Sequence, residues 1–354
     1  MKKKVVVAMS GGVDSSVTAA MLLEQGYDVS GMTMKLWDQR FAGVSDQVME
    51  NLPDAAGDAR KVADQLQIKH HVVDFMADFR NRVVTPFCQE YFTGRTPNPC
   101  ALCNKQIKFG LLLDKARELG ADYLATGHYV RLAERSGRYL IRKADDLKKD
   151  QSYFLFGLNQ EQLRSCLFPL GEFNKQQVRE KAAGLQLPVA TKSESQDICF
   201  IPDGDYVNFL ERQAGGGRLS GEIVHVSGRV LGSHQGVYRY TIGQRKGLGI
   251  GWHEPLFVIA IDVNDRKIIV GEKKYLNKQE LLAVDCNWSI AAPNEPISAA
   301  CRIRYRHQEV PARIEPLESG QVKVVFERPQ DGITPGQAAV FYDNDLVLGG
   351  GWIQ

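Results

Sequence analysis

The sequence of 354 residues predicts an α/β protein in which a doubly wound parallel sheet is followed by β-rich domains. Two observations lead to this expectation. In the N-terminal half, apolar runs of strand length alternate with segments of helical spacing, the pattern of a parallel sheet covered by helices on both faces. Past the glycine run Gly215–Gly217, short β-like runs with frequent glycines replace the helical pattern. A chain of this length is too long for one ordinary core, so we expect several domains.

The first apolar run, Val5–Met9, is apolar on both faces, as in a strand buried inside a parallel sheet. It leads into the glycine loop Ser10–Ser16, and helical spacing follows over Val17–Leu23. Paired glycines let the backbone approach a phosphate, and the unpaired amides of a helix N-terminus point toward it. The loop is not a Walker A motif, because no Lys-Ser or Lys-Thr pair follows the glycines. We interpret it as an anion site, with a plain turn as the alternative.

The following segments continue the alternation of strands and helices. We expect strands over Tyr27–Met34, His70–Asp74 and Ala121–Tyr129, a helix over Asp58–Gln67, and a loop over the polar stretch Lys35–Asn51. Ligands of doubly wound sheets bind at the carboxyl ends of the strands. Met34 and the Gly-His turn at Gly127 should therefore lie on the same rim as the first loop.

Two neighbouring cysteines, Cys100 and Cys103, lie at the start of another expected helix. Prolines exclude regular structure just before them, and Ile107–Leu119 has helical apolar spacing. The helix N-terminus and nearby Lys105 would both stabilise a thiolate. Half of a structural zinc site is the alternative, but it needs a second cysteine pair. The other cysteines are all solitary: Cys88, Cys166, Cys199, Cys286 and Cys301.

Two further segments carry side chains that suit RNA. Lys148–Phe154 combines basic, amide and aromatic groups, which can contact phosphates and bases. A solvated turn before a buried aromatic segment is the alternative. Arg302–Arg306 alternates arginine with Ile303 and Tyr305, so a strand there would place three arginines on one face. A charged strand edge that prevents aggregation is the alternative.

The composition is that of a soluble globular protein, with 44% apolar and 24% charged residues. The net charge is only +2, so a nucleic acid must be bound by local patches. Residues 206–280 contain 11 Lys or Arg and 7 Asp or Glu, whereas 281–354 contain 6 and 9, which favours the middle segment for RNA contact. No secretory signal or membrane span is recognisable, and the odd number of cysteines, seven, favours reduced thiols. We therefore expect a cytoplasmic protein without a membrane partner.

Five motifs of the chain together resemble a known family. They are Ser-Gly-Gly-Val-Asp-Ser at 10–15, Gly-Arg-Thr-Pro-Asn-Pro at 94–99, Ala-Thr-Gly-His-Tyr at 125–129, Lys-Asp-Gln-Ser-Tyr-Phe at 149–154 and Asp-Ile-Cys-Phe-Ile at 197–201. The first alone resembles the pyrophosphate loop of the ATP-pyrophosphatases. In combination they resemble the tRNA-specific 2-thiouridylases, the MnmA/TrmU family, and the resemblance extends to residues 241–251 and 334–342.

This resemblance implies the fold and the domain organisation. The N-terminal sheet would be an ATP-pyrophosphatase domain of the adenine nucleotide alpha hydrolase-like type, followed by two small β-rich domains, the last a β-barrel. We divide the chain into a catalytic domain over 1–205, a central tRNA-binding domain over 206–280 and a C-terminal barrel over 281–354. The first boundary should fall within about ten residues of Gly215–Gly217.

The resemblance also implies a reaction. ATP with Mg²⁺ adenylates the C2 oxygen of the wobble uridine in tRNA, and sulfur then displaces AMP. Cys199 would carry a persulfide received from a sulfur relay protein or a desulfurase. Cys103 would be the nucleophile that releases the sulfur or closes a disulfide with Cys199. One thiol must carry the sulfur and the other must resolve the carrier.

The site residues follow from the same resemblance. The nucleotide would contact Ala8, Met9, Ser10, Gly11, Gly12, Val13, Asp14, Ser15, Met34 and Gly127. The tRNA would contact Asn98, Pro99, Cys100, Lys149, Asp150, Gln151, Arg304 and Tyr305. No resident metal ion is expected in the persulfide reaction.

One position departs from the family pattern. Cys100 stands where an aspartate is usual, and a thiol accepts a proton only as a thiolate, so the identity of the base is open. Cys100, Cys103 and Cys199 could instead hold an iron–sulfur cluster. An ATP-pyrophosphatase acting on a small molecule would leave the paired thiols without a role, and a non-catalytic RNA-binding module would leave the glycine loop without one.

Overall fold

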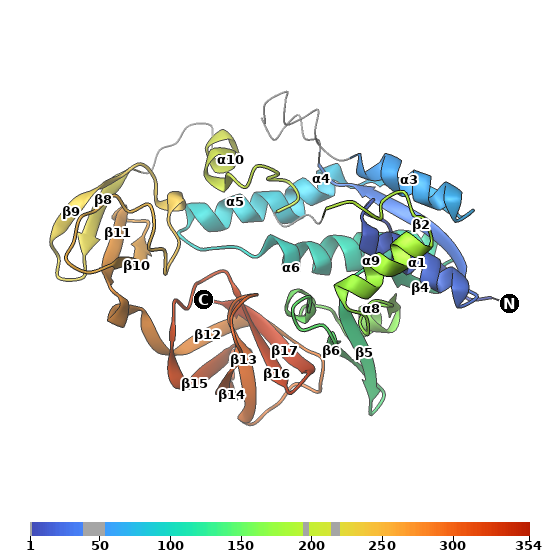
Figure 1. The fold of residues 1–354 in the computed structure, drawn as a ribbon. Helices are drawn as coiled ribbons and strands as arrows, with labels where there is room; N and C mark the ends of the chain where they lie inside the picture. Colours follow the sequence, from blue (N-terminus) through green and yellow to red (C-terminus); the bar gives the residue numbers. More distant parts are fainter. Residues whose placement is uncertain (1, 38–53, 194–197, 214–219) are drawn as a thin grey trace.

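The computed structural model describes residues 2–37, 54–193, 198–213 and 220–354 (Figure 1). Three features of the sequence lie wholly or largely outside these ranges. They are the expected loop over 35–51, the glycine run at 215–217, and residues 194–197, which precede Ile198 and include the first residue of the Asp-Ile-Cys-Phe-Ile motif.

A parallel sheet forms the N-terminal domain, which confirms the predicted fold class. Its five strands have the order β3-β2-β1-β4-β7, and every neighbouring pair is parallel. The strands are β1 (Lys4–Ala8), β2 (Asp28–Lys35), β3 (Lys69–Asp74), β4 (Tyr123–Ala125) and β7 (Cys166–Leu167).

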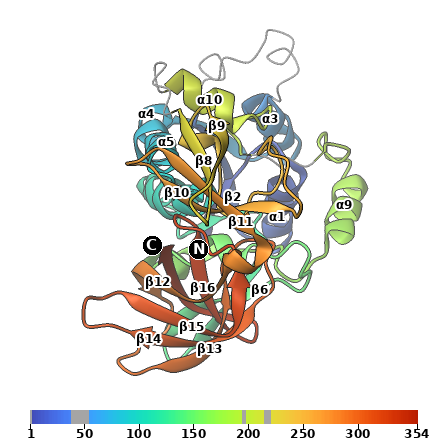
Figure 2. The ribbon, with the colours of Figure 1, turned by 90° about the vertical axis from the view of Figure 1, so that its left-hand side faces the viewer.

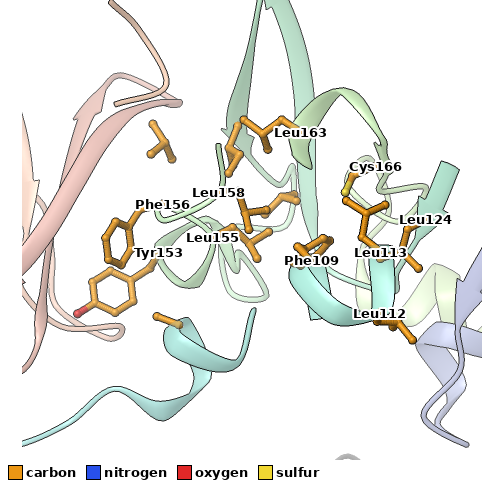
Figure 3. Close-up of a cluster of buried hydrophobic side chains, with 14 of the residues drawn as sticks. Phe109, Leu112, Leu113, Leu124, Tyr153, Leu155, Phe156, Leu158, Leu163 and Cys166 are labelled. Carbon is orange, nitrogen blue, oxygen red and sulfur yellow. The ribbon is translucent and has the colours of Figure 1, made fainter. Parts of the chain in front are cut away.

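Helices cover both faces of this sheet, because neighbouring residues of a buried strand point to opposite sides. Val5 and Val7 pack with α1 (Val13–Glu24), α3 (Ala55–Gln65) and α9 (Lys175–Gly184). Val6 points to the other face, where the cluster drawn in Figure 3 includes Leu112, Leu113 and Leu124.

Two long helical segments extend from the sheet between the other domains (Figure 1). The first consists of α4 (Met76–Phe79), the π-helical η2 (Arg80–Val84) and α5 (Thr85–Phe92). The second consists of α6 (Pro99–Cys103), the π-helical η3 (Asn104–Leu111) and α7 (Leu112–Glu118). The shorter helices nearby are η4 (Ser152–Phe154) and α8 (Gln160–Arg164).

The central domain is a four-stranded sheet of order β10-β11-β8-β9. Its elements are β8 (Gly221–His225), β9 (Val230–His234), η5 (Val237–Arg239), β10 (Leu256–Asp262), β11 (Lys267–Glu272) and η6 (Lys273–Leu276). The preceding helix α10 (Tyr206–Gln213) packs Phe209 and Leu210 against Phe87 and Phe200 of the N-terminal domain. Its Glu211 also accepts a hydrogen bond from the hydroxyl of Tyr238 in η5, so α10 packs against both domains.

The C-terminal domain is a closed six-stranded barrel, as expected. Its strands are β12 (Asn277–Trp288), β13 (Ile297–Arg302), β14 (Val310–Pro316), β15 (Val322–Asp331), β16 (Ala338–Asp343) and β17 (Leu346–Ile353). β12 pairs with both β15 and β17 and so closes the barrel. The expected boundary at 280 falls inside β12, because this strand already begins at Asn277.

The N-terminal domain contributes a hairpin to the barrel sheet. Strands β5 (Val130–Arg135) and β6 (Arg138–Lys143) extend it beyond β17, where Leu346 pairs with Arg142. Figure 2 shows the barrel below the parallel domain. None of the helices in the described part of the chain has the length and apolar character needed to cross a membrane.

Candidate active site

The glycine loop lies between β1 and the N-terminus of α1, as the sequence predicts. Gly11 has a φ of +66°, and a Cβ atom there would lie 2.5 Å from the carbonyl oxygen of Ala55 at the start of α3. No side chain caps α1 at Gly12, so the first amides of the helix are left for another acceptor. This backbone cradle fits a phosphate group.

The expected nucleotide residues gather around this loop. A Cβ atom on Gly127 would lie 2.9 Å from the amide nitrogen of Ser15, so the turn after β4 touches the start of α1. Met34 lies at the carboxyl end of β2, two residues beyond Met32, which pairs with Ala8. The rim predicted for ligand binding is therefore continuous in the fold.

Two lysines that the sequence reasoning missed also reach the loop. Nζ of Lys175 donates to both carboxylate oxygens of Asp14, at 2.7 and 2.9 Å, and the hydroxyl of Tyr129 donates to Oδ1 at 2.8 Å. Nζ of Lys192 donates to the carbonyl oxygen of Gly11 at 2.9 Å and to Asp58 at 2.7 Å. Lys175 could have been suspected, because a cation in the first turn of a helix opposes the helix dipole.

The thiols come from two distant segments. Asn98 caps α6 by accepting a hydrogen bond from the amide of Ala101 at 3.1 Å, which places Cys100 in the first turn and Cys103 at the end of α6. Burial, with smaller contributions from the thiols of Cys103 and Cys100, raises the pKa of Cys199 to about 12. Cys103 packs in one buried cluster with Phe200, the residue after Cys199, so the two segments lie side by side.

Burial shifts all three thiols toward their protonated form. Burial raises the pKa of Cys103 to about 11, and it also raises that of Cys100. Cys103 is buried, whereas Cys100 and Cys199 keep exposed surface. Water solvates part of a thiolate at the exposed positions, so burial disfavours the thiolate of Cys103 more than those of the other two.

The expected stabilisation of a thiolate by Lys105 is wrong. The side chain of Lys105 lies against Gly157, whose added Cβ would be 3.3 Å from Cδ of the lysine. The cation that lowers the pKa of the thiols is Lys108, and burial outweighs it. A π-helical segment over Asn104–Leu111, which spacing alone does not reveal, shifts the helix face on which these lysines lie.

An iron–sulfur cluster does not fit the three thiols as they stand. Within the described ranges, no group of three His, Cys, Asp or Glu side chains is placed to hold a metal ion. The donor set for a cluster, three convergent thiolates, is therefore not assembled in this structure.

The segments expected to contact tRNA are brought together. The ring of Tyr305 packs on Phe154 with 4.4 Å between centroids, and Nη1 of Arg302 lies 3.4 Å from Oδ2 of Asp150. The turn over 149–151 and the segment over 302–306 thus form one surface next to η4. Tyr153, in η4, is buried and interacts with Asn98, so η4 also packs against the start of α6, where Asn98 and Pro99 are buried.

Several of these side chains already have partners inside the protein. Asp150 is buried and accepts hydrogen bonds from Ser152 through both its amide and its hydroxyl. Gln151 accepts from the amide of Tyr129 at 2.9 Å. Lys149 is half-buried in the same turn.

The expected strand of alternating arginines is wrong. β13 ends at Arg302, and the amide of His307 donates to the carbonyl of Arg304 at 3.1 Å, closing a turn. The chain must reverse here to form β14, so the three arginines do not share a strand face. Arg304 donates from Nη2 to the carbonyl oxygens of Asp331 and Gly332, both at 2.8 Å, while Arg306 is exposed.

The barrel contacts the loop that precedes the thiol helix, our name for the continuous helical segment of α6, η3 and α7 that carries Cys100 and Cys103. Nε2 of Gln337 donates to the carbonyl oxygens of Thr96 and Pro97, both at 3.0 Å, and the amide of Thr96 donates to the carbonyl of Pro335 at 2.8 Å. The motifs at 94–99 and 334–342 are therefore two sides of one interdomain contact.

Family models match almost the whole chain. The tRNA methyl transferase HUP domain matches residues 3–203, the tRNA methyl transferase PRC-barrel domain matches 207–272, and the aminomethyltransferase β-barrel domain matches 278–353.

Among solved structures, a 4-thiouridine synthetase–RNA complex with bound ATP is similar over 60% of this chain and 50% of its own, with 18% identity and a TM-score of 0.37. The U34-tRNA thiolase NcsA from Methanococcus maripaludis with its [4Fe-4S] cluster is similar over 61% of this chain and 68% of its own, with 20% identity and a TM-score of 0.35.

Curated relatives are much more similar. The tRNA-specific 2-thiouridylase MnmA of Syntrophotalea carbinolica is 56% identical over 351 residues, which cover 99% of this chain and 98% of the relative. The protein of the same name from Geotalea uraniireducens is 52% identical and covers 100% of this chain and 95% of the relative. The chain therefore belongs to the tRNA-specific 2-thiouridylase MnmA family of enzymes.

Proposed function

We propose that this protein replaces the C2 oxygen of the wobble uridine in tRNA by sulfur, using ATP and a cysteine persulfide. The observation that carries the proposal is that the segments of Cys103 and Cys199, far apart in the sequence, pack together: Cys103 shares a buried cluster with Phe200, and Ile198 packs against it. A carrier thiol and a resolving thiol must meet in this way for sulfur to be transferred.

ATP serves the first step. The C2 oxygen is a poor leaving group, so the uridine oxygen attacks the α-phosphate, AMP becomes attached to it and pyrophosphate leaves. The cradle at Gly11 and Gly12 supports pyrophosphate binding, and Lys175 and Lys192 supply positive charge beside it. Residues Ala8–Ser15, Met34 and Gly127 line the nucleotide site in this proposal.

Sulfur serves the second step. The terminal sulfur of a Cys199 persulfide, or hydrosulfide released from it, attacks C2 and AMP leaves with the bond electrons. The Cys103 thiolate attacks Sγ of Cys199, so a Cys103–Cys199 disulfide forms as the outer sulfur is reduced. A cellular thiol reductant then reduces the disulfide with two electrons, and a sulfur relay protein or a desulfurase reloads the Cys199 thiol. We place the reaction in the cytoplasm, where thiols stay reduced.

The tRNA contacts in this proposal are Asn98, Pro99 and Cys100 at the thiol helix, the turn over 149–151, and Arg304 with Tyr305. Their juxtaposition through the Tyr305–Phe154 contact supports one continuous surface. The target base must leave the anticodon stack to reach the thiols. Burial raises the pKa of Cys100, which disfavours this thiol as a proton acceptor.

The test is incubation of the enzyme with tRNA, ATP·Mg²⁺ and a persulfide donor, followed by mass spectrometry of the nucleosides. We expect 2-thiouridine at the wobble position and pyrophosphate release that depends on tRNA. Pyrophosphate release without tRNA would indicate a small-molecule substrate, and tRNA binding without pyrophosphate release would indicate a binding module.

A further inference from the structure

Lys108 follows Cys103 by five residues in the thiol helix. In an α-helix, residues five apart are separated by about 140° around the axis. The segment Asn104–Leu111 is π-helical, and the amide of Leu112 donates to the carbonyl of Ile107, five residues earlier. The wider π-helical turn reduces this angle, so Lys108 lies nearer to the face of Cys103 than regular α-helical spacing would place it.

The surroundings of Lys108 connect the thiols to the nucleotide rim. Its neighbours Ile107 and Phe109 are fully buried, while Lys108 itself is half-buried. The ring of Phe109 lies 5.7 Å from the ring of His128, which follows Gly127 in the turn that touches the start of α1. Burial places the pKa of His128 well below its usual value and Lys108 lowers it further, so His128 is neutral beside this cation.

Lys108 acts on all three thiols. Burial raises the pKa of Cys100, Cys103 and Cys199, and in each case Lys108 opposes the rise. The remaining ionisable groups that face Cys103 are the other two thiols. Among the residues that the structure describes, no carboxylate forms an ion pair with Lys108, in contrast to Lys143 and Lys115, which pair with Glu309 and Glu118.

We propose that Lys108 is the cation that stabilises anionic sulfur in this site. This proposal rests on the proposed function and adds a residue to its second step. The Cys103 thiolate attacks Sγ of the Cys199 persulfide, the Cys103–Cys199 bond forms, and the outer sulfur leaves as hydrosulfide with the electrons of the broken sulfur–sulfur bond. The Cys103 thiolate carries the negative charge before the attack, and the hydrosulfide carries it afterwards. In this proposal Lys108 stabilises both anions.

The experiment compares three variants with the parent enzyme. Lys108→Met removes the charge with little change in length, Lys108→Arg keeps the charge, and Lys105→Met removes a charge from the same helix at a position that faces Gly157. The first measurement is the pH dependence of Cys103 modification by a small thiol reagent, followed by peptide mass spectrometry without tRNA or nucleotide. It requires no persulfide and therefore does not depend on the sulfur route.

We expect Cys103 in Lys108→Met to react roughly tenfold more slowly at pH 8, corresponding to a pKa about one unit higher. The rate of Cys103 modification in Lys108→Arg and Lys105→Met should stay within about twofold of the parent rate. A tenfold change in rate would require the pKa of Cys103 to shift by a full unit. An unchanged pH profile in Lys108→Met overturns the proposal. An equal loss of Cys103 reactivity in Lys105→Met also overturns the proposal, because it would show that removing any nearby positive charge has this effect.

The second measurement is tRNA-dependent pyrophosphate release. Lys108→Met should still release pyrophosphate while its thiolation slows. Loss of pyrophosphate release with unchanged Cys103 reactivity would assign Lys108 to the nucleotide and overturn its role toward sulfur. If the parent enzyme does not thiolate tRNA, the proposed function is contradicted. The role of Lys108 toward Cys103 is still tested, because the reactivity of Cys103 is measured in a separate experiment.

Discussion

Lys175 donates from Nζ to both carboxylate oxygens of Asp14, at 2.7 and 2.9 Å, directly beside the glycine loop. The pair joins the first turns of α9 and α1. A phosphate bound in the loop would attract the same ammonium group, so Lys175 can exchange a carboxylate partner for a phosphate partner without leaving the site.

We expect Lys175→Met to weaken ATP binding by roughly tenfold or more, because a hydrogen bond to a charged group contributes about 1.5–3 kcal/mol. Asp14→Ala should abolish pyrophosphate release while tRNA still binds. The matched control is Lys181→Met, which removes a lysine of the same helix that lies over the ring of Phe173. Isothermal titration with a non-hydrolysable ATP analogue measures the effect, and equal affinities in both lysine variants would remove Lys175 from the site.

Binding of tRNA should weaken steeply with salt, because phosphate contacts release counterions. Arg245 and Lys246 are exposed in the central domain, so Arg245→Ala and Lys246→Ala should each flatten the salt slope by roughly one counterion. Arg304→Ala should also flatten it, provided the guanidinium leaves the carbonyls of Asp331 and Gly332 for a phosphate. Filter binding at several salt concentrations gives the slopes, and three unchanged slopes would exclude this surface.

Gln337 stabilises the contact between the barrel and the loop before the thiol helix. Gln337→Ala leaves the carbonyl oxygens of Thr96 and Pro97 without their donor, and we expect a loss of about 1–3 kcal/mol in the free energy of unfolding. Gln308→Ala, at an exposed position of the same domain, should change it by no more than about 0.5 kcal/mol. Denaturant titration measures both, and equal values would show that the contact contributes nothing.

Sulfur release should be faster at higher pH. The attacking Cys103 thiol has a pKa raised by burial to about 11, so its thiolate fraction rises by about tenfold per pH unit between pH 7 and 9. Single-turnover release of hydrosulfide from persulfidated enzyme should follow this slope. Pyrophosphate release should not, because no thiol attacks in that step. A flat profile for hydrosulfide would show that Cys103 is already a thiolate at pH 7.

Local patterns predict the nucleotide side of the site well. The loop at Gly11 follows from the order of strand, glycines and helix start, which requires only neighbouring residues. The approach of Lys175 and Lys192 to that loop could not be predicted, because it depends on how α9 and the segment after it pack on α1.

The sulfur side was less accessible to sequence reasoning. Motif resemblance singled out Cys103 and Cys199, whereas nearness in the sequence selected Lys105 as their cation. Because Asn104–Leu111 is π-helical, Lys108 is the cation near the thiols instead. The spacing of apolar residues in a sequence does not reveal a π-helical segment. Likewise, alternation at 302–306 suggested a strand, but the chain turns there to begin β14.

The central claim is that two cysteines, without iron, transfer sulfur to tRNA. Each of the variants Cys103→Ser and Cys199→Ser should be inactive, whereas Cys100→Asp, which restores the residue usual in the family, should retain activity. These variants do not by themselves exclude a cluster, because an aspartate can also ligate iron.

The most direct test is therefore the activity of iron-free protein under anaerobic conditions, with tRNA, ATP·Mg²⁺ and a persulfide donor. We expect robust formation of 2-thiouridine and, without reductant, a Cys103–Cys199 disulfide in the spent enzyme. Strict dependence of thiolation on iron, with a visible iron–sulfur absorbance that Cys100→Ser abolishes, would contradict the persulfide route.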